Sequence, residues 1–134
     1  MSTPKRRVAV IASGGGLDTA YKTLNIATAA AAMDSEVGIF FTFEGLTIIH
    51  QEAVHKLNMG PDKEHFVEGF KQANVPSVSE LLEVARESGV RMIACQMTMD
   101  VMGLTKDSFI AGIEIGGAAT FLDFAYDADV SLSF

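Results

Sequence analysis

Cysteine and basic residues are both scarce in this chain of 134 residues. The one cysteine, Cys95, cannot close a disulfide within the chain, so a disulfide-stapled secreted scaffold is excluded and the expected compartment is the reducing cytoplasm. Only 10 lysines and arginines stand against 17 acidic residues, which gives a formal net charge of −7. Such a chain repels a phosphate backbone, so we expect no nucleic-acid partner. The short basic run 5–7 indicates that residues 1–7 form a flexible, solvated N-terminal arm.

Long apolar runs are also absent. None reaches the roughly 18–20 residues that a membrane-spanning helix needs, so we expect no integral membrane segment. The apolar run 8–12 follows a basic start, but it is too short for a secretory signal and is better explained as a buried strand. A hydrophobic content of 49% and a charged content of 20% are those of a globular protein. We therefore expect one domain over residues 1–134.

Apolar runs and helical spacings alternate along the rest of the chain. Strands are predicted over 8–12, 36–42, 90–95, 111–115 and 130–134. Helices are predicted over 17–33, 77–89 and 118–128, with an irregular helical segment over 44–55, a helical turn over 66–72, a short helix beginning at Thr98 or Asp100 and ending near Leu104, and a second turn near 106–109. This alternation predicts an α/β fold, a three-layer α/β/α sandwich around a mostly parallel sheet.

Ligands of such folds bind beyond the carboxyl ends of the strands. Four segments fall at predicted strand ends, and we expect their residues to shape a pocket around Cys95. These residues are Gly14, Gly15, Gly16, Thr42, Phe43, Glu44, Gln96, Met97, Gly116 and Gly117.

Cys95 has two competing interpretations. A lone cysteine is often an inert part of a core, since free cysteine is among the most buried residue types. Cys95, however, ends a strand, and N–H groups of the following short helix would lower the pKa of its thiol. No basic residue follows it closely, so a cationic partner would have to come through space, with His50 and His55 as candidates. In the catalytic interpretation the sulfur must reach solvent or a partner.

Metal and cofactor motifs are weak. The glycine loop 13–16 lacks both the dinucleotide-binding and the Walker spacing. Four methionines surround the cysteine and would suit Cu(I), but methionine is more often an adaptable packing residue: Met92, Met97, Met99 and Met102. No zinc-binding spacing exists. We expect neither a metal nor a cofactor.

Four segments together resemble the DsrE/DsrF-like sulfur-relay family, in particular its branch often labelled peroxiredoxin. They are the glycine loop after the first strand, 40–46, 94–100 and 114–121. The resemblance covers nearly the whole chain. It implies an α/β/α domain with a five-stranded parallel sheet, a trimer or hexamer, and a sulfur-carrying cysteine at the position of Cys95. Some relatives have a membrane segment or a second cysteine, and this sequence shows neither.

The resemblance implies a sulfurtransferase or sulfur carrier that holds sulfur on Cys95 as a persulfide or thiosulfonate and passes it to a partner thiol. Its partners would be sulfur-donor and sulfur-acceptor proteins or small thiols. One cysteine suffices for this chemistry, whereas a peroxidase or dithiol oxidoreductase would need a second thiol. Two other functions stay open: a non-catalytic assembly subunit with an inert cysteine, and a small-ligand or nucleotide-binding module that uses the glycine loop.

Overall fold

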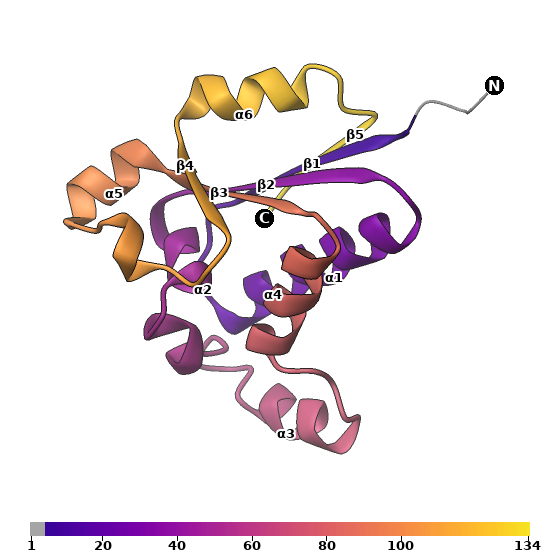
Figure 1. Cartoon of the computed structure of the whole chain (residues 1–134). Coiled ribbons are helices and arrows are strands. Elements are labelled where there is room, and N and C mark those ends of the chain that lie inside the picture. The colour runs from indigo at the N-terminus through magenta and orange to yellow at the C-terminus, as the bar shows by residue number, and fades with distance from the viewer. Residues whose placement is uncertain (1–4) are drawn as a thin grey trace.

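The computed structural model describes residues 5–134 and contains one five-stranded sheet (Figure 1). Its strands are β1 (Arg7–Ala12), β2 (Glu36–Phe41), β3 (Arg91–Cys95), β4 (Ile113–Gly116) and β5 (Val130–Ser133). Their order across the sheet is β4-β3-β2-β1-β5, and every neighbouring pair is parallel. The predicted α/β fold is confirmed, with a sheet that is parallel throughout.

Six helices connect the strands. They are α1 (Leu17–Ala32), α2 (Leu46–Ile49), α3 (His65–Gln72), α4 (Val78–Glu87), α5 (Gln96–Met102) and α6 (Ala118–Ala125). The segment predicted as one irregular helix over 44–55 is divided into a 3₁₀ turn at Phe43–Gly45, α2, and a second 3₁₀ turn at Ala53–Lys56. A third 3₁₀ turn, Lys106–Ser108, lies where the second turn was predicted. The connections between strands are therefore mostly helical, as a parallel sheet requires.

The two faces of the sheet are covered unequally. Figure 1 shows α6 alone above the sheet and α1 and α4 below it, with α3 farthest from the sheet. Alternate side chains of each strand point to opposite faces. Met92 and Ala94 of β3 join the larger core beneath, whereas Ile93 and Cys95 join a smaller cluster with Phe121 and Phe124 of α6. The sheet thus presents Cys95 on its thinly covered face.

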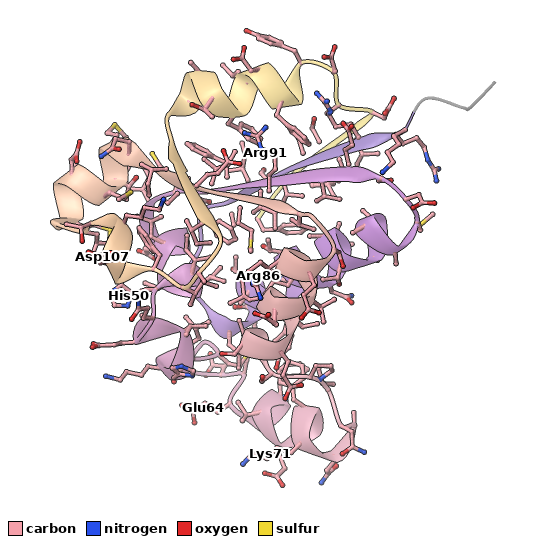
Figure 2. All side chains as sticks on the ribbon, in the orientation of Figure 1. His50, Glu64, Lys71, Arg86, Arg91 and Asp107 are labelled. Atoms are coloured by element: carbon pink, nitrogen blue, oxygen red, sulfur yellow. The ribbon has the colours of Figure 1, made fainter. Side chains whose placement is uncertain are left out.

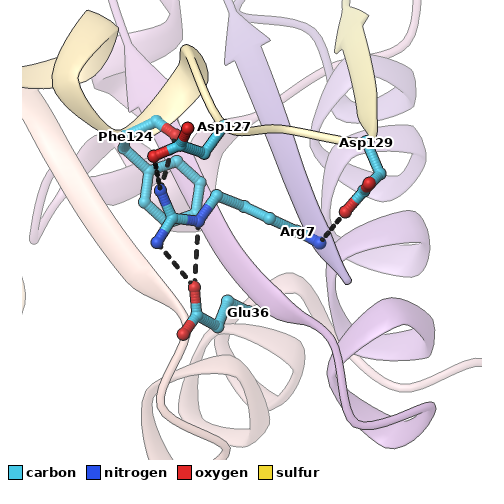
Figure 3. Close-up of polar contacts among 5 residues, drawn as sticks. All are labelled: Arg7, Glu36, Phe124, Asp127 and Asp129. Atoms are coloured by element: carbon cyan, nitrogen blue, oxygen red, sulfur yellow. Dashed lines mark hydrogen bonds and ion pairs between the residues drawn. The ribbon is translucent and has the colours of Figure 1, made fainter. Parts of the chain in front are cut away.

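The prediction of a solvated arm is wrong for Arg7, and residues 1–4 lie outside the described part. Arg7 is the first residue of β1, and its guanidinium binds Glu36 at 2.7 Å, the carbonyl of Phe124 at 3.0 Å and Asp127 at 3.7 Å (Figure 3). The same guanidinium lies 4.5 Å from the centre of the Phe124 ring. These contacts attach the end of α6 to the sheet. The helix α6 ends at Ala125, before the predicted boundary at 128.

Among residues 5–134, no helix is both long and apolar enough to cross a membrane.

Candidate functional site

The carboxyl ends of β1, β2 and β3 meet at one edge of the sheet. There the turn after β2 packs directly on the end of β1: the N–H of Thr42 donates to the carbonyl of Ala12 at 3.0 Å. A Cβ on Gly45 would lie 2.0 Å from that same carbonyl oxygen, and one on Gly15 would lie 2.7 Å from the carbonyl oxygen of Glu44. Glycine at both positions therefore allows the approach that brings Phe43 and Glu44 to the site.

Cys95 lies at this edge, at the end of β3 and between the ends of β2 and β4. It is the last residue of β3, pairs in register with Gly116 of β4, and is the N-cap residue of α5. The short helix begins immediately at Gln96, earlier than predicted. The side chain of Cys95 is 5% exposed and packs among apolar residues under α6, so the expectation that its sulfur is open to solvent is not met.

Polar groups border the other side of the sulfur. Burial raises the pKa of the Cys95 thiol, but the hydroxyl and N–H of Thr98, the hydroxyl of Thr42 and the N–H of Met97 lower it. The lowering outweighs the desolvation, so the pKa of Cys95 lies below the usual value of a cysteine thiol. The neutral thiol makes no capping hydrogen bond of ordinary length. These donors therefore act mainly on the thiolate, which attracts N–H and O–H groups more strongly.

Three residues form a hydrogen-bonded network next to the sulfur. The hydroxyl oxygen of Thr98 accepts the N–H of Phe43 at 3.2 Å and lies 3.3 Å from the hydroxyl of Thr42. Thr98 is 2% exposed, so it is shielded from water, whereas Phe43 is 58% exposed. Phe43 has φ 49°, in the left-handed region that bulky residues seldom adopt and that costs about 1–3 kcal/mol. The edge thus holds a strained residue beside its only thiol.

A surface hollow of about 420 Å³ opens beside the network. Its lining is mainly apolar, with one acidic side chain, and consists of Ser13, Gly14, Phe43, Glu44, Thr98, Val101, Met102 and Phe134. Thr98 belongs both to this lining and to the surroundings of the sulfur. A partner could therefore approach Cys95 from the side of this hollow.

The structure brings only part of the predicted pocket together. Gly14, Phe43 and Glu44 line the hollow, Thr42 borders the sulfur, and Gly116 pairs with Cys95. The others have different positions. Gly15 packs beneath Glu44, Gly16 is the N-cap residue of α1, Gln96 donates to Asp100 at 3.0 Å, and the N–H of Gly117 donates to Thr120 at 3.3 Å. Met97 contributes only its N–H to the surroundings of the sulfur, since the residue is 58% exposed.

Neither histidine candidate contacts the thiol. Nδ1 of His50 accepts the N–H groups of Glu52 and Ala53, and His55 lines cavities bordered by α4. Figure 2 shows His50 on the same side of the sheet as Arg86, whereas Arg91 lies on the side of α6. Within residues 5–134, no group of three or more His, Cys, Asp or Glu side chains is arranged to hold a metal ion. The site is thus built from hydroxyls and backbone N–H groups.

Comparison with known proteins identifies the family. The sequence model of the DsrE/DsrF/DrsH-like family matches residues 4–70 and 54–133, nearly the entire chain. The chain belongs to the DsrE/DsrF/DrsH-like family. The resemblance stated from the sequence is confirmed.

Two bacterial relatives of this family match over almost their full length. The sulfur carrier protein DsrE2 of Allochromatium vinosum is 36% identical over 155 residues, covering 96% of this chain and 98% of the relative. The uncharacterized protein YrkE of Bacillus subtilis is 31% identical over 160 residues, covering 98% of this chain and 99% of the relative. The chain is therefore a homologue of a sulfur carrier protein.

Solved structures agree on the fold. The YchN protein of Escherichia coli has a TM-score of 0.72 and 18% identity, covering 96% of this chain and 99% of the other. MTH1491 of Methanobacterium thermoautotrophicum, a protein of unknown function, has a TM-score of 0.69 and 13% identity, covering 97% and 100%. At this identity they establish a shared fold and nothing about chemistry.

Sequence reasoning missed the roles of Thr98 and Gly45. Thr98 was expected to cap a helix, yet it is the third residue of α5 and borders the sulfur. The signal that could have found it is a helix that follows a strand with no loop between them, since the third helical residue then lies next to the N-cap side chain. Gly45 gave no such signal, because its partner, Ala12, is distant in sequence.

Proposed function

We propose that this DsrE-like protein carries sulfane sulfur as a persulfide on Cys95 and passes it to the thiol of a partner in cytoplasmic sulfur trafficking. The observation that supports this most is the position of Cys95, at the end of β3 among donors that lower its pKa. The homology to a sulfur carrier protein over nearly the whole chain supports it independently.

The chemistry needs one thiolate. The Cys95 sulfur attacks the outer sulfur of a donor persulfide, a new S–S bond forms, the S–S bond of the donor breaks, and the donor leaves as a thiolate. An acceptor thiolate then attacks the outer sulfur held on Cys95 and releases Cys95 as a thiolate. The two transfers balance without an external oxidant or reductant. A donor that presents a thiosulfonate would be attacked at its outer sulfur, and it would leave as a sulfinate in place of a thiolate.

Access to the sulfur requires local opening, because Cys95 is almost completely buried. Thr98 separates it from the hollow, so the opening belongs to the start of α5. Phe43 and Val101 line that hollow and are 58% and 79% exposed. These apolar side chains suit contact with the thiol-bearing segment of a partner protein.

The test of the proposal is the mass of the intact protein after incubation with a persulfide donor. We expect the wild type to gain sulfur and Cys95→Ser to gain none, because the chain contains no other cysteine. If no donor, whether a persulfide, polysulfide or thiosulfate, leaves sulfur on Cys95, the proposal is wrong.

A non-catalytic assembly subunit is the second candidate, and the burial of Cys95 favours it. In that case the native protein would neither accept sulfur nor react with a thiol-alkylating reagent until it unfolds. A carrier instead reacts under native conditions, more slowly than a fully exposed thiol. The rate of alkylation of the folded protein separates the two functions.

The structure offers little support for a nucleotide site at the glycine loop. The N–H of Leu17, at the start of α1, already donates to the carbonyl of Asn58 at 2.9 Å. The carboxylate of Asp18 lies in the first turn of that helix and would repel a phosphate. A thermal shift caused by a nucleotide would revive this function.

A further inference from the structure

Thr98 is one of only two polar residues that are buried within the described chain, and the other, Thr23, has no hydrogen-bond partner for its hydroxyl. The hydroxyl of Thr98, in contrast, has three polar neighbours. Its hydroxyl accepts from the N–H of Phe43, lies 3.3 Å from the hydroxyl of Thr42, and borders the sulfur of Cys95. Such a connected buried hydroxyl has a defined direction for its hydrogen.

Counting hydrogens gives that direction. A threonine hydroxyl has one hydrogen and two lone pairs. The N–H of Phe43 occupies one lone pair of Thr98 and cannot accept, so the hydrogen of Thr98 can go only to Thr42 or to Cys95. When Cys95 is a thiolate, a hydrogen bond to its negative charge is stronger than one between two neutral hydroxyls. The hydrogen of Thr98 then points at the sulfur, and the hydroxyl of Thr42 can donate either to the sulfur or to the remaining lone pair of Thr98.

The backbone at Phe43 fixes this arrangement. Phe43 adopts its left-handed conformation at the beginning of the turn that Gly45 holds against the carbonyl of Ala12. The side chain of Phe43 is mostly exposed, so packing of the ring does not account for the strain. What the conformation does provide is an N–H directed at Thr98. Strain of this kind is typical of functional sites.

No charged side chain is among the groups that shift the pKa of Cys95. Glu44 lines the hollow, Asp100 lies on α5, Asp123 lies on α6, and Glu114 of β4 is paired with Arg91 at 2.8 Å. A carboxylate cannot stabilise the Cys95 thiolate, because both groups are negatively charged. Stabilisation of the sulfur anion must therefore come from neutral donors, and Thr98 supplies both a hydroxyl and an N–H.

We propose that Thr98 is the residue that positions and stabilises the anionic sulfur of Cys95, and that the left-handed turn at Phe43 keeps the Thr98 hydroxyl directed at that sulfur. The inference rests on the proposed carriage of sulfur by Cys95. Stabilisation of the thiolate by Thr98 serves both transfers, since the thiolate attacks the donor and is the leaving group when the acceptor takes the sulfur.

The test is the pH dependence of alkylation of Cys95 by iodoacetamide, which reports the fraction of thiolate. Thr98→Val keeps the shape of the side chain and removes the hydroxyl. We expect its midpoint to rise by about one pH unit, which is roughly a tenfold loss of thiolate below both midpoints. Thr98→Ser should restore the wild-type profile. Thr23→Val is the matched control, because it removes a buried hydroxyl that has no partner, and should leave the profile unchanged.

Circular dichroism and melting curves show whether each variant is folded. A folded Thr98→Val with the wild-type midpoint would overturn the inference, as would a Thr98→Ser that fails to restore it. Should Thr98→Val not fold, Thr98→Ser and Thr42→Val are compared with the wild type. Thr42→Val should raise the alkylation midpoint by less than about one pH unit, which is a loss of thiolate smaller than roughly tenfold. An unchanged midpoint in Thr42→Val would contradict the network. Loading from a persulfide donor is measured separately. Wild type that takes no sulfur refutes the proposed function, whereas an unmoved midpoint refutes only the role of Thr98.

Discussion

At the scale of single residues, the environment of Cys95 decides what this chain can do. On one side its neighbours are apolar and would favour an inert thiol, while on the other side hydroxyls and N–H groups lower its pKa. Because the pKa is lowered, the Cys95 thiol loses its proton at a lower pH than the thiol of a free cysteine does. Reactivity at neutral pH therefore exceeds what burial alone would allow.

Glu44 gives a prediction about the charge of the reagents that reach Cys95. Its carboxylate lines the hollow and should repel anions. We expect Glu44→Gln to speed alkylation by iodoacetate, an anion, by roughly threefold at low salt relative to alkylation by neutral iodoacetamide. Glu87→Gln at the end of α4 is the control and should leave the ratio of the two rates unchanged. An unchanged ratio in Glu44→Gln would show that the reagents enter by another route.

At the scale of elements, the turn Phe43–Gly45 links the ends of β1 and β2 to the site. Gly45→Ala would place a Cβ against a backbone carbonyl of β1, which cannot move aside as a flexible side chain can. We expect this variant to lower the free energy of unfolding by about 2–4 kcal/mol and to raise the midpoint of Cys95 alkylation. The check is urea unfolding followed by the pH profile.

Gly69→Ala is the matched control for that variant. Gly69 lies inside α3, and nothing stands within 4 Å of a Cβ added there. Alanine in an exposed helix should stabilise the protein by about 0.5–1 kcal/mol and leave Cys95 unaffected. If Gly45→Ala were as harmless as Gly69→Ala, the close approach of the turn to β1 would not be needed.

Most elements could be predicted from the sequence, because buried strands and amphipathic helices have local signatures. The strand around 8–12 and the helix after Ser77, whose hydroxyl accepts the N–H of Glu80 at 3.1 Å, are examples. The errors concern contacts distant in the sequence. Arg7 was placed in an arm because Glu36 and Asp127 could not be seen as its partners. Cys95 was located at its strand end, but the role of Thr98 depended on where α5 begins.

At the scale of the whole molecule, large apolar side chains remain in water on the described chain. Val101 on α5 and Tyr126 after α6 are 79% and 77% exposed. Together with the family resemblance, this exposure leads us to propose a homotrimer or hexamer. Light scattering coupled to size exclusion should give three or six times the mass of the 14.3 kDa chain. A monomer across the whole range of concentrations would refute the assembly and leave the chemistry of Cys95 untouched.

The central claim is tested most directly by following one sulfur atom onto Cys95 and off again. Protein loaded from a persulfide donor is freed of donor, mixed with an acceptor thiol, and weighed over time. The added sulfur should disappear from the protein and appear as persulfide on the acceptor, while Cys95→Ser should never gain it. A folded wild type that takes no sulfur, or that holds it against every acceptor thiol, would contradict the account.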